Sequence, residues 1–165
     1  MSEDSPRALD GKEADAKEAD AMEADAMDVR DFALGWRWTD PARRRLDERT
    51  LSAIRPQAES VARELAREAA VRRRGTHAGA TAFRADDDPA TVRRALEALG
   101  VDERASVVVS WNESTAVLTR WSVFLAHWGD FCYPMRDDVT IWSPGEDWTL
   151  AYERFEVFRF VEAGS

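Results

Sequence analysis

The spacing of hydrophobic residues along the sequence changes near residue 104. In the first part apolar residues recur at helical spacing, and Val61, Leu65 and Ala69 would share one face of a helix predicted over about residues 56–74. In the second part apolar and aromatic residues follow the period of two that is typical of strands. The pattern therefore predicts helices first and a sheet afterwards.

Two Asp-Pro pairs mark the beginnings of further helices in the first part, since an acidic N-cap and a proline in the first turn are frequent there. Asp40 begins a helix predicted over 41–54, and Asp88 begins one predicted over 89–99. Large aromatic or aliphatic residues occupy every second position over 32–38, which predicts a short strand before these helices. The segment before Asp88 is rich in Gly, Ala, Thr and Asp, which predicts a loop.

Strands dominate the second part. Runs of β-forming residues predict strands over residues 106–111, 116–119, 139–142, 148–153 and 155–161. One helix interrupts them, because Trp121, Phe124, Leu125 and Trp128 have the i, i+3, i+4, i+7 spacing of an aromatic helix face. The predicted fold class is α+β: N-terminal helices followed by a mainly antiparallel sheet with one inserted aromatic helix.

Negative charge is concentrated at the N-terminus. Residues 1–26 hold nine acids and three bases, a net charge of −6 out of −9 for the chain, and they repeat the pentapeptides KEADA, KEADA and MEADA. A five-residue period fits neither helix nor strand, and the segment has too little apolar surface to fold. We therefore expect a disordered acidic repeat tail over 1–26 and a single α+β domain over 27–165.

Composition argues against several classes of protein. The apolar runs are shorter than the roughly 20 residues that a membrane-spanning helix needs, and no secretory leader is expected. The single cysteine, Cys132, fits a reducing compartment, so we expect a cytoplasmic protein without membrane contact. Neither GxGxxG nor GxxxxGKS/T occurs, so no nucleotide cofactor is predicted.

Two arginine clusters, 43–45 and 72–74, raise the question of nucleic-acid binding. Acidic residues are interleaved with them, and residues 27–104 carry 16 bases against 14 acids, a net charge of +2 that is too small for strong attraction to phosphates. No nucleic-acid partner is expected. The spacings of Cys132 and the two histidines match no zinc pattern, so no metal site is expected either.

One segment gathers residues that could carry chemistry. Its members are His127, Asp130, Cys132, Asp137 and Asp138. A Cys–His mechanism needs the imidazole about 3 Å from the thiol and a third group that orients it. Positions five apart on a helix differ by about 140°, so His127 and Cys132 meet only if the helix ends between them. A small hydrolase or transferase that uses His127 with Asp130, Asp137 or Cys132 is therefore the alternative interpretation, and a non-enzyme is the favoured one.

The tryptophans are numerous, seven in 165 residues, and most of them fit a small hydrophobic core. Near a Pro-Gly turn, however, aromatic residues stand among acids. The predicted binding surface consists of Trp142, Glu146, Asp147, Trp148, Tyr152 and Glu153. An acidic face attracts a basic ligand and an aromatic anchor prolongs the bound state, so this surface predicts a basic protein partner.

The same part of the chain carries a family resemblance. Residues Trp121–Pro144, WSVFLAHWGDFCYPMRDDVTIWSP, and Trp148–Phe158, WTLAYERFEVF, resemble the W-x-x-F-x-x-x-W-x-x-F-x-x-P signature of small uncharacterised bacterial proteins. Some of those proteins accompany secreted toxins and are similar to immunity proteins. The resemblance implies a bacterial protein without established catalysis, and it assigns a role to no residue.

These observations favour a non-catalytic protein that acts by protein–protein binding through the acidic aromatic surface, with toxin neutralisation of the immunity type as its most specific form. Besides the enzyme alternative, a structural homodimeric module stays open. In such a dimer exposed aromatic side chains of two copies would meet.

Overall fold

The α+β prediction is confirmed. The computed structural model describes residues 17, 20, 26–77 and 80–162, so the predicted disordered tail lies outside the described residues except for Lys17, Asp20 and Ala26. The helices are α2 Trp36–Thr39, α3 Glu48–Ser52, α4 Glu59–Gly75, α5 Pro89–Glu97 and α6 Trp121–Phe131. The strands are β1 Arg55–Pro56, β2 Thr81–Arg84, β3 Ser106–Asn112, β4 Thr115–Arg120, β5 Val139–Trp142, β6 Trp148–Glu153 and β7 Val157–Glu162.

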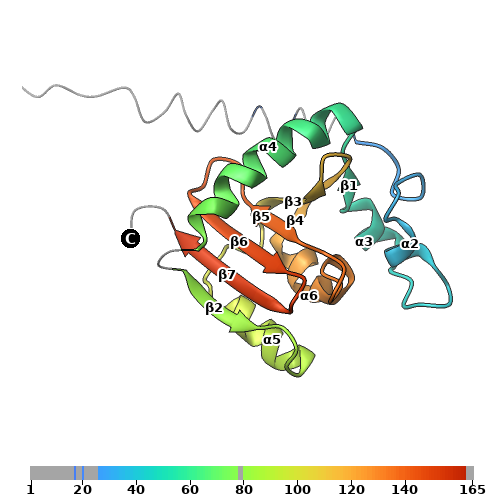
Figure 1. The fold of residues 1–165 in the computed structure, drawn as a ribbon. Coiled ribbons are helices and arrows are strands. Elements are labelled where there is room, and N and C mark those ends of the chain that lie inside the picture. Colours follow the sequence, from blue (N-terminus) through green and yellow to red (C-terminus); the bar gives the residue numbers. More distant parts are fainter. Residues whose placement is uncertain (1–16, 18–19, 21–25, 78–79, 163–165) are drawn as a thin grey trace, which may run out of the picture.

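The strands form one seven-stranded sheet in the order β1-β4-β3-β5-β6-β7-β2, and every neighbouring pair is antiparallel. The five strands of the second part make the middle of the sheet (Figure 1). Strands β1 and β2 come from the first part of the chain and close its two edges. The C-terminal part of the chain therefore builds the middle of the sheet, and the N-terminal part supplies its two edge strands.

Alternating strand residues divide the hydrophobic core between the two faces of the sheet. On one face α4 buries Ala62, Leu65 and Ala69 against a cluster that includes Val108 and Trp142. On the other face the aromatic side of α6 packs on a larger cluster that also receives side chains from α2, α3 and α5. Figure 1 shows α4 lying across one face of the sheet, with α5 and α6 on the opposite side of the sheet.

The strand predicted over 32–38 is wrong. This segment is a series of turns that leads into α2. Phe32 and Trp38 are both buried, with ring centroids 6.2 Å apart. A Cβ on Gly35 would lie 1.9 Å from the carbonyl oxygen of Val29, so only glycine allows the chain to fold back on itself here. The alternation of aromatic residues reflects packing inside a compact loop rather than a pleated strand.

Two other predictions needed correction. The helix predicted over 41–54 is confined to α3, because Asp47 rather than Asp40 is the N-cap and accepts a hydrogen bond of 2.8 Å from the Thr50 amide. The predicted loop before Asp88 contains β2, which pairs with β7 although its residues are largely exposed. An edge strand of this kind lacks the apolar alternation by which strands are recognised. The Asp88 N-cap of α5 is confirmed.

Candidate anion-binding site

The aromatic part of the predicted binding surface is buried, so that surface is wrong as a docking patch. Trp142 is 1% exposed, Trp148 5% and Tyr152 1%. Trp142 lies in the cluster beneath α4, and the other two lie in the cluster beneath α6. Burial removes the large apolar area of these rings from water and so stabilises the fold. Burial also raises the pKa of the Tyr152 hydroxyl.

The acids of that surface are engaged or separated from one another. The indole N–H of Trp148 donates a hydrogen bond to the exposed Glu146 carboxylate, and Glu153 forms an ion pair of 2.9 Å with Arg159. Asp147 is exposed at the rim of a shallow cavity near the end of α4. These carboxylates therefore do not form the continuous acidic face that would attract a basic partner.

The thiol proposed as a nucleophile is enclosed. Cys132 is 1% exposed, and burial raises the pKa of its thiol well above the ordinary range. Its neighbour Asp137 accepts hydrogen bonds of 2.6 and 3.1 Å from the two terminal nitrogens of Arg37, and another of 2.8 Å from the Tyr133 amide. Both groups thus belong to the interior, and a thiol with a raised pKa is a poor nucleophile at neutral pH.

The remaining residues of the alternative polar site diverge. His127 and Asp130 are half-buried at a kink in α6, where His127 has a non-helical φ of −130°. Burial lowers the pKa of His127 and raises that of Asp130, and each charge partly offsets the shift of the other. Asp138 instead pairs with Arg154 at 2.6 Å. The structure therefore brings His127 near Asp130 but assembles no triad with Cys132 or Asp138.

A polar cavity that the sequence did not predict lies where α3, β1, the β3–β4 pair and the start of α6 meet. Its volume is about 540 Å³, within the usual range for ligand sites. Four arginines line it: Arg49, Arg55, Arg104 and Arg120. None of the other described residues that line it is acidic. We refer to this cavity as the arginine pocket.

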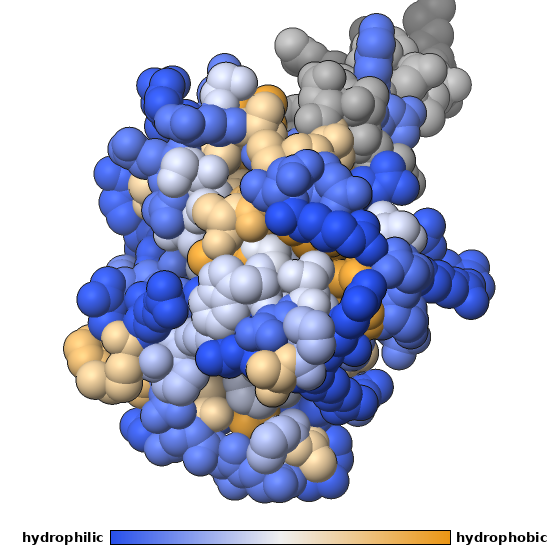
Figure 2. Space-filling model, turned by 90° about the vertical axis from the view of Figure 1, so that its right-hand side faces the viewer, coloured by the Kyte–Doolittle hydropathy of each residue, from blue (hydrophilic) through white to orange (hydrophobic). Residues whose placement is uncertain are grey.

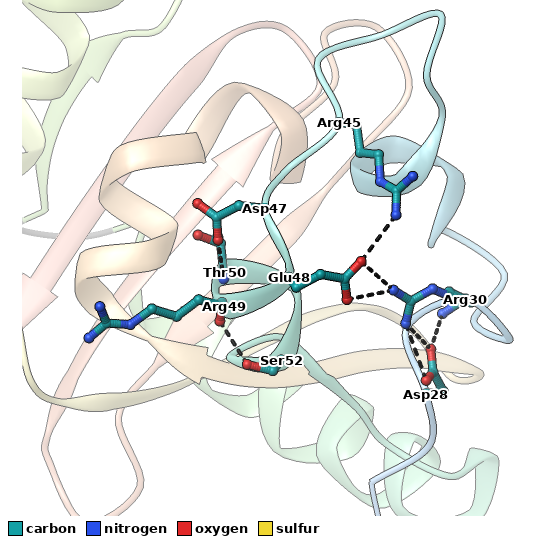
Figure 3. A network of polar contacts seen from close by, with 8 residues as sticks. All are labelled: Asp28, Arg30, Arg45, Asp47, Glu48, Arg49, Thr50 and Ser52. Atoms are coloured by element: carbon teal, nitrogen blue, oxygen red, sulfur yellow. Dashed lines mark hydrogen bonds and ion pairs between the residues drawn. The ribbon is translucent and has the colours of Figure 1, made fainter.

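Three of the four cations of the arginine pocket form no ion pair with any described residue. The nearby carboxylate of Glu48 binds Arg30 at 2.7 Å and Arg45 at 3.1 Å, on the side of α3 away from Arg49 (Figure 3). Arg49 has no side-chain hydrogen bond or ion pair within the part of the chain that the structure describes, and the same holds for Arg104 and Arg120. These guanidinium groups are therefore free to bind an anion.

Hydroxyl groups and the start of α6 also line the pocket. Ser122 and Val123, the second and third residues of α6, belong to its wall, but the first two amides of this helix already donate hydrogen bonds of 2.9 and 3.0 Å to backbone carbonyl oxygens, so the donors that the pocket offers are its side chains. The N-cap residue Arg120 provides no side-chain cap. The hydroxyls of Ser106 and Ser122 also line the pocket and can donate hydrogen bonds. Planar guanidinium groups with hydroxyl donors suit a carboxylate or a phosphate.

The surface offers no second obvious docking feature. Figure 2 shows hydrophilic residues over most of the side that carries α2 and α3, with hydrophobic residues in small separate areas. The large apolar side chains found exposed in the described ranges are Met27, Val71, Met135 and Phe155, which come from different elements. The exposed aromatic patch assumed for a homodimer is therefore not seen on the described residues, where Phe155, at 65% exposed, is the one exposed aromatic residue.

The described residues also bear on metal sites and membrane-spanning helices. Within residues 26–77 and 80–162, no three His, Cys, Asp or Glu side chains come close enough to hold a metal ion. None of the helices in these ranges is both long and apolar enough to cross a membrane.

Part of the arginine pocket could have been inferred from the sequence. Strands β3 and β4 coincide with two predicted strands, and their register pairs Ser106 with Arg120, which brings the flanking Arg104 to the same end. The contributions of Arg49 and Arg55 depend on how the edge strand β1 pairs with β4. A two-residue strand containing proline has no recognisable sequence signal.

No family model, curated protein or solved structure matches the chain.

Proposed function

We propose that the protein is a non-catalytic binding protein that holds an acidic segment of a partner protein in the arginine pocket. The observation that carries the proposal is a cavity of about 540 Å³ lined by four arginines, three of which form no ion pair with any described residue. The three arginines that form no ion pair repel one another, and a bound anion relieves that repulsion. The proposal keeps protein binding as the activity but replaces the basic partner by an acidic one.

Binding rather than catalysis is favoured by what surrounds the pocket. Its lining residues are arginines, serines, threonines and apolar side chains. They include no histidine, cysteine or carboxylate that could act as nucleophile or general base. Such a set of donors holds and orients an anion.

The resemblance of residues 121–158 to immunity-type proteins suggests a toxin as the partner, in which case the pocket would bind an acidic segment of that toxin. We place this function in the cytoplasm, because a protein with one cysteine, buried and unpaired, gains nothing from an oxidising compartment.

Fluorescence anisotropy with fluorescein-labelled hexaglutamate tests the proposal on the full chain at low ionic strength. Water screens the charge-assisted hydrogen bonds of exposed arginines, so each one contributes modestly to the binding free energy. We therefore expect Arg49→Ser and Arg120→Ser each to weaken binding about threefold to tenfold. The double variant should weaken it further. The matched control is Arg67→Ser, which removes one exposed arginine of α4 that does not line the pocket and should leave the affinity unchanged.

Three results would overturn the proposal. The first is that hexaglutamate does not bind the native chain at all. The second is that the double variant and the control lose equal affinity. The third is that an oligonucleotide of equal charge binds more tightly than hexaglutamate. The last result would identify the arginine pocket as a nucleic-acid site.

A further inference from the structure

We propose that the arginine pocket recognises a phosphorylated serine or threonine side chain of the partner protein, so that phosphorylation of the partner controls binding. This inference rests on the proposed function and names the anionic group that the pocket holds. Three properties of the pocket support it: the separate segments that carry its unpaired cations, the size of the cavity, and the residues that complete its wall.

The unpaired cations of the pocket come from three segments of the chain. Arg49 belongs to α3, Arg104 to the turn before β3, and Arg120 to the end of β4. All three residues are exposed and line the same cavity. In Figure 3 the side chain of Arg49 extends to the side of α3 opposite Glu48. A ligand in the cavity can therefore be contacted by guanidinium groups of three different segments.

Hydrogen bonds hold these segments together. The hydroxyl of Thr119 donates a hydrogen bond of 2.8 Å to the carbonyl oxygen of Ala53, which fixes β4 against the end of α3. The amide of Trp121 donates one of 2.9 Å to the carbonyl oxygen of Ala105, which fixes the turn before β3 at the start of α6. The backbone that carries the three arginines is thus in place before a ligand binds, and this lowers the entropic cost of binding.

A phosphoryl group matches three cations better than a carboxylate does. A carboxylate has one charge and two oxygens in a plane, and a single guanidinium can bind both oxygens with parallel hydrogen bonds. A phosphorylated side chain carries a charge of about −1.5 to −2 at pH 7 and has three strong acceptor oxygens. Each oxygen can accept a hydrogen bond from a different arginine, and the higher charge offsets more of the repulsion among the cations.

The size of the pocket limits how many charged groups can enter it. A sphere of about 540 Å³ is about 10 Å across, and an extended chain rises about 3.3 Å per residue with alternate side chains on opposite sides. About three residues therefore span the cavity, and two of their side chains point the same way. Glutamates would place two charges about 7 Å apart, whereas a phosphoryl group concentrates the same charge on one atom.

The rest of the wall fits a short phosphorylated side chain. The hydroxyls of Ser106 and Ser122 form no hydrogen bond with any other described residue and can donate to a phosphoryl oxygen. Ala53, Leu118 and Val123 supply apolar surface for the Cβ atom and for the methyl group of a threonine. No described aromatic residue lines the pocket, so the ring of phosphotyrosine would find no aromatic partner. The lining therefore favours phosphoserine or phosphothreonine.

Three fluorescein-labelled alanine pentapeptides test the inference on the full chain by anisotropy at pH 7.5. The first carries one phosphoserine, the second carries two glutamates two positions apart, and the third carries an unmodified serine. The first two have nearly equal charge and differ in how that charge is distributed. We expect the phosphoserine peptide to bind about tenfold more tightly than the diglutamate peptide, and the serine peptide to bind about a hundredfold more weakly than the phosphoserine peptide.

Arginine variants measure how many cations each peptide contacts. We expect Arg49→Ser, Arg104→Ser and Arg120→Ser each to weaken binding of the phosphoserine peptide about tenfold, because its phosphoryl group contacts all three side chains. The same variants should weaken binding of the diglutamate peptide about threefold. The control Arg67→Ser, outside the pocket, should change neither affinity.

Acid provides a measurement that depends on the phosphoryl group itself. Its second pKa is about 6, so lowering the pH from 7.5 to 5.5 leaves about a quarter of the dianion and should weaken binding of the phosphoserine peptide about fourfold. The pKa of a glutamate is about 4.3, so the affinity of the diglutamate peptide should stay unchanged over this range. An equal change for both peptides would overturn the inference, because titration of the protein would then explain the effect.

The outcomes separate this inference from the function on which it rests. If the diglutamate peptide binds as tightly as the phosphoserine peptide, the inference is overturned while hexaglutamate binding still supports the pocket. If the free amino acid phosphoserine binds as tightly as the peptide, the ligand is a phosphorylated small molecule, and the inference is overturned as well. If hexaglutamate and the phosphoserine peptide both fail to bind, the proposed function itself fails.

Discussion

Arg37 and Asp137 lie 100 positions apart in the sequence and form a bidentate ion pair inside the protein. Their side chains are 1% and 8% exposed. The guanidinium carbon of Arg37 lies 4.1 Å from the centre of the Tyr133 ring, while its Nε has no hydrogen-bond partner. The pair joins α2 to the turn before β5, so it fixes the N-terminal loop on the sheet.

Removing one member of this pair should be strongly destabilising. Asp137→Asn leaves the cation of Arg37 buried without its counter-charge, and we expect the free energy of unfolding to fall by about 3–5 kcal/mol. Urea denaturation followed by tryptophan fluorescence measures the change. The control is Asp138→Asn, which breaks a more exposed pair with Arg154 and should cost about 1 kcal/mol or less. Equal losses in the two variants would contradict a structural role for the buried pair.

The Cys132 thiol should react only when the protein unfolds. It is enclosed, and burial raises its pKa, so the thiolate is scarce in the native state. We expect reaction with a thiol reagent such as DTNB to be at least a hundredfold slower than in urea-unfolded protein. Fast labelling under native conditions would show that the thiol is reachable and would restore the enzyme alternative. Conversely, Cys132→Ala should retain hexaglutamate binding.

Acid should weaken the fold through His127. Burial lowers its pKa in the folded state, with Asp130 and Asp47 opposing that shift, whereas the unfolded value is about 6.5. Below about pH 6.5 the unfolded chain therefore binds a proton that the folded chain does not, and stability falls until the pH reaches the folded pKa. Urea titrations between pH 7 and 5 should show this slope in the native chain and a smaller one in His127→Gln. If stability depends on pH equally steeply in His127→Gln and in the native chain, groups other than His127 cause the acid sensitivity.

Truncating the tryptophans of the abandoned binding surface should affect folding rather than recognition. Trp142 is packed between α4 and the sheet, and Arg72 lies over its ring at 5.5 Å. Trp142→Ala should lower the free energy of unfolding by about 3–5 kcal/mol. Glu146→Lys, at an exposed position of the same predicted surface, should cost about 0.5–1 kcal/mol. A folded Trp142→Ala variant of native stability would contradict its placement in the core.

Sequence reasoning succeeded where a local pattern and the tertiary structure agree. The spacing of Val61, Leu65 and Ala69 anticipated α4, although Val61 itself is only half-buried. The aromatic spacing from Trp121 anticipated α6, and strands β3 and β4 lie where the pattern predicts strands over 106–111 and 116–119. Each of these elements packs against a single continuous surface, so its buried apolar residues recur at the helical or strand period in the sequence.

It failed where long-range contacts determine local structure. The segment before α2 takes its form from Gly35, which meets Val29, and from Arg37, which reaches Asp137. The acids near Trp148 suggested a binding surface because sequence shows charge but does not show which aromatic rings are buried. Similarly, arginines from α3, β1, β4 and the turn before β3 form one pocket only after β1 has paired with β4.

The order of the strands also constrains biosynthesis. Strands β1 and β2 precede residue 106, yet their pairing partners β4 and β7 follow it. A ribosome that adds about 5–20 residues per second needs roughly 3–12 s to make the intervening 60 or so residues. During that interval the nascent N-terminal half has apolar side chains and unpaired strands but no sheet to receive them. We expect it to depend on the ribosome surface or a chaperone until translation is nearly complete.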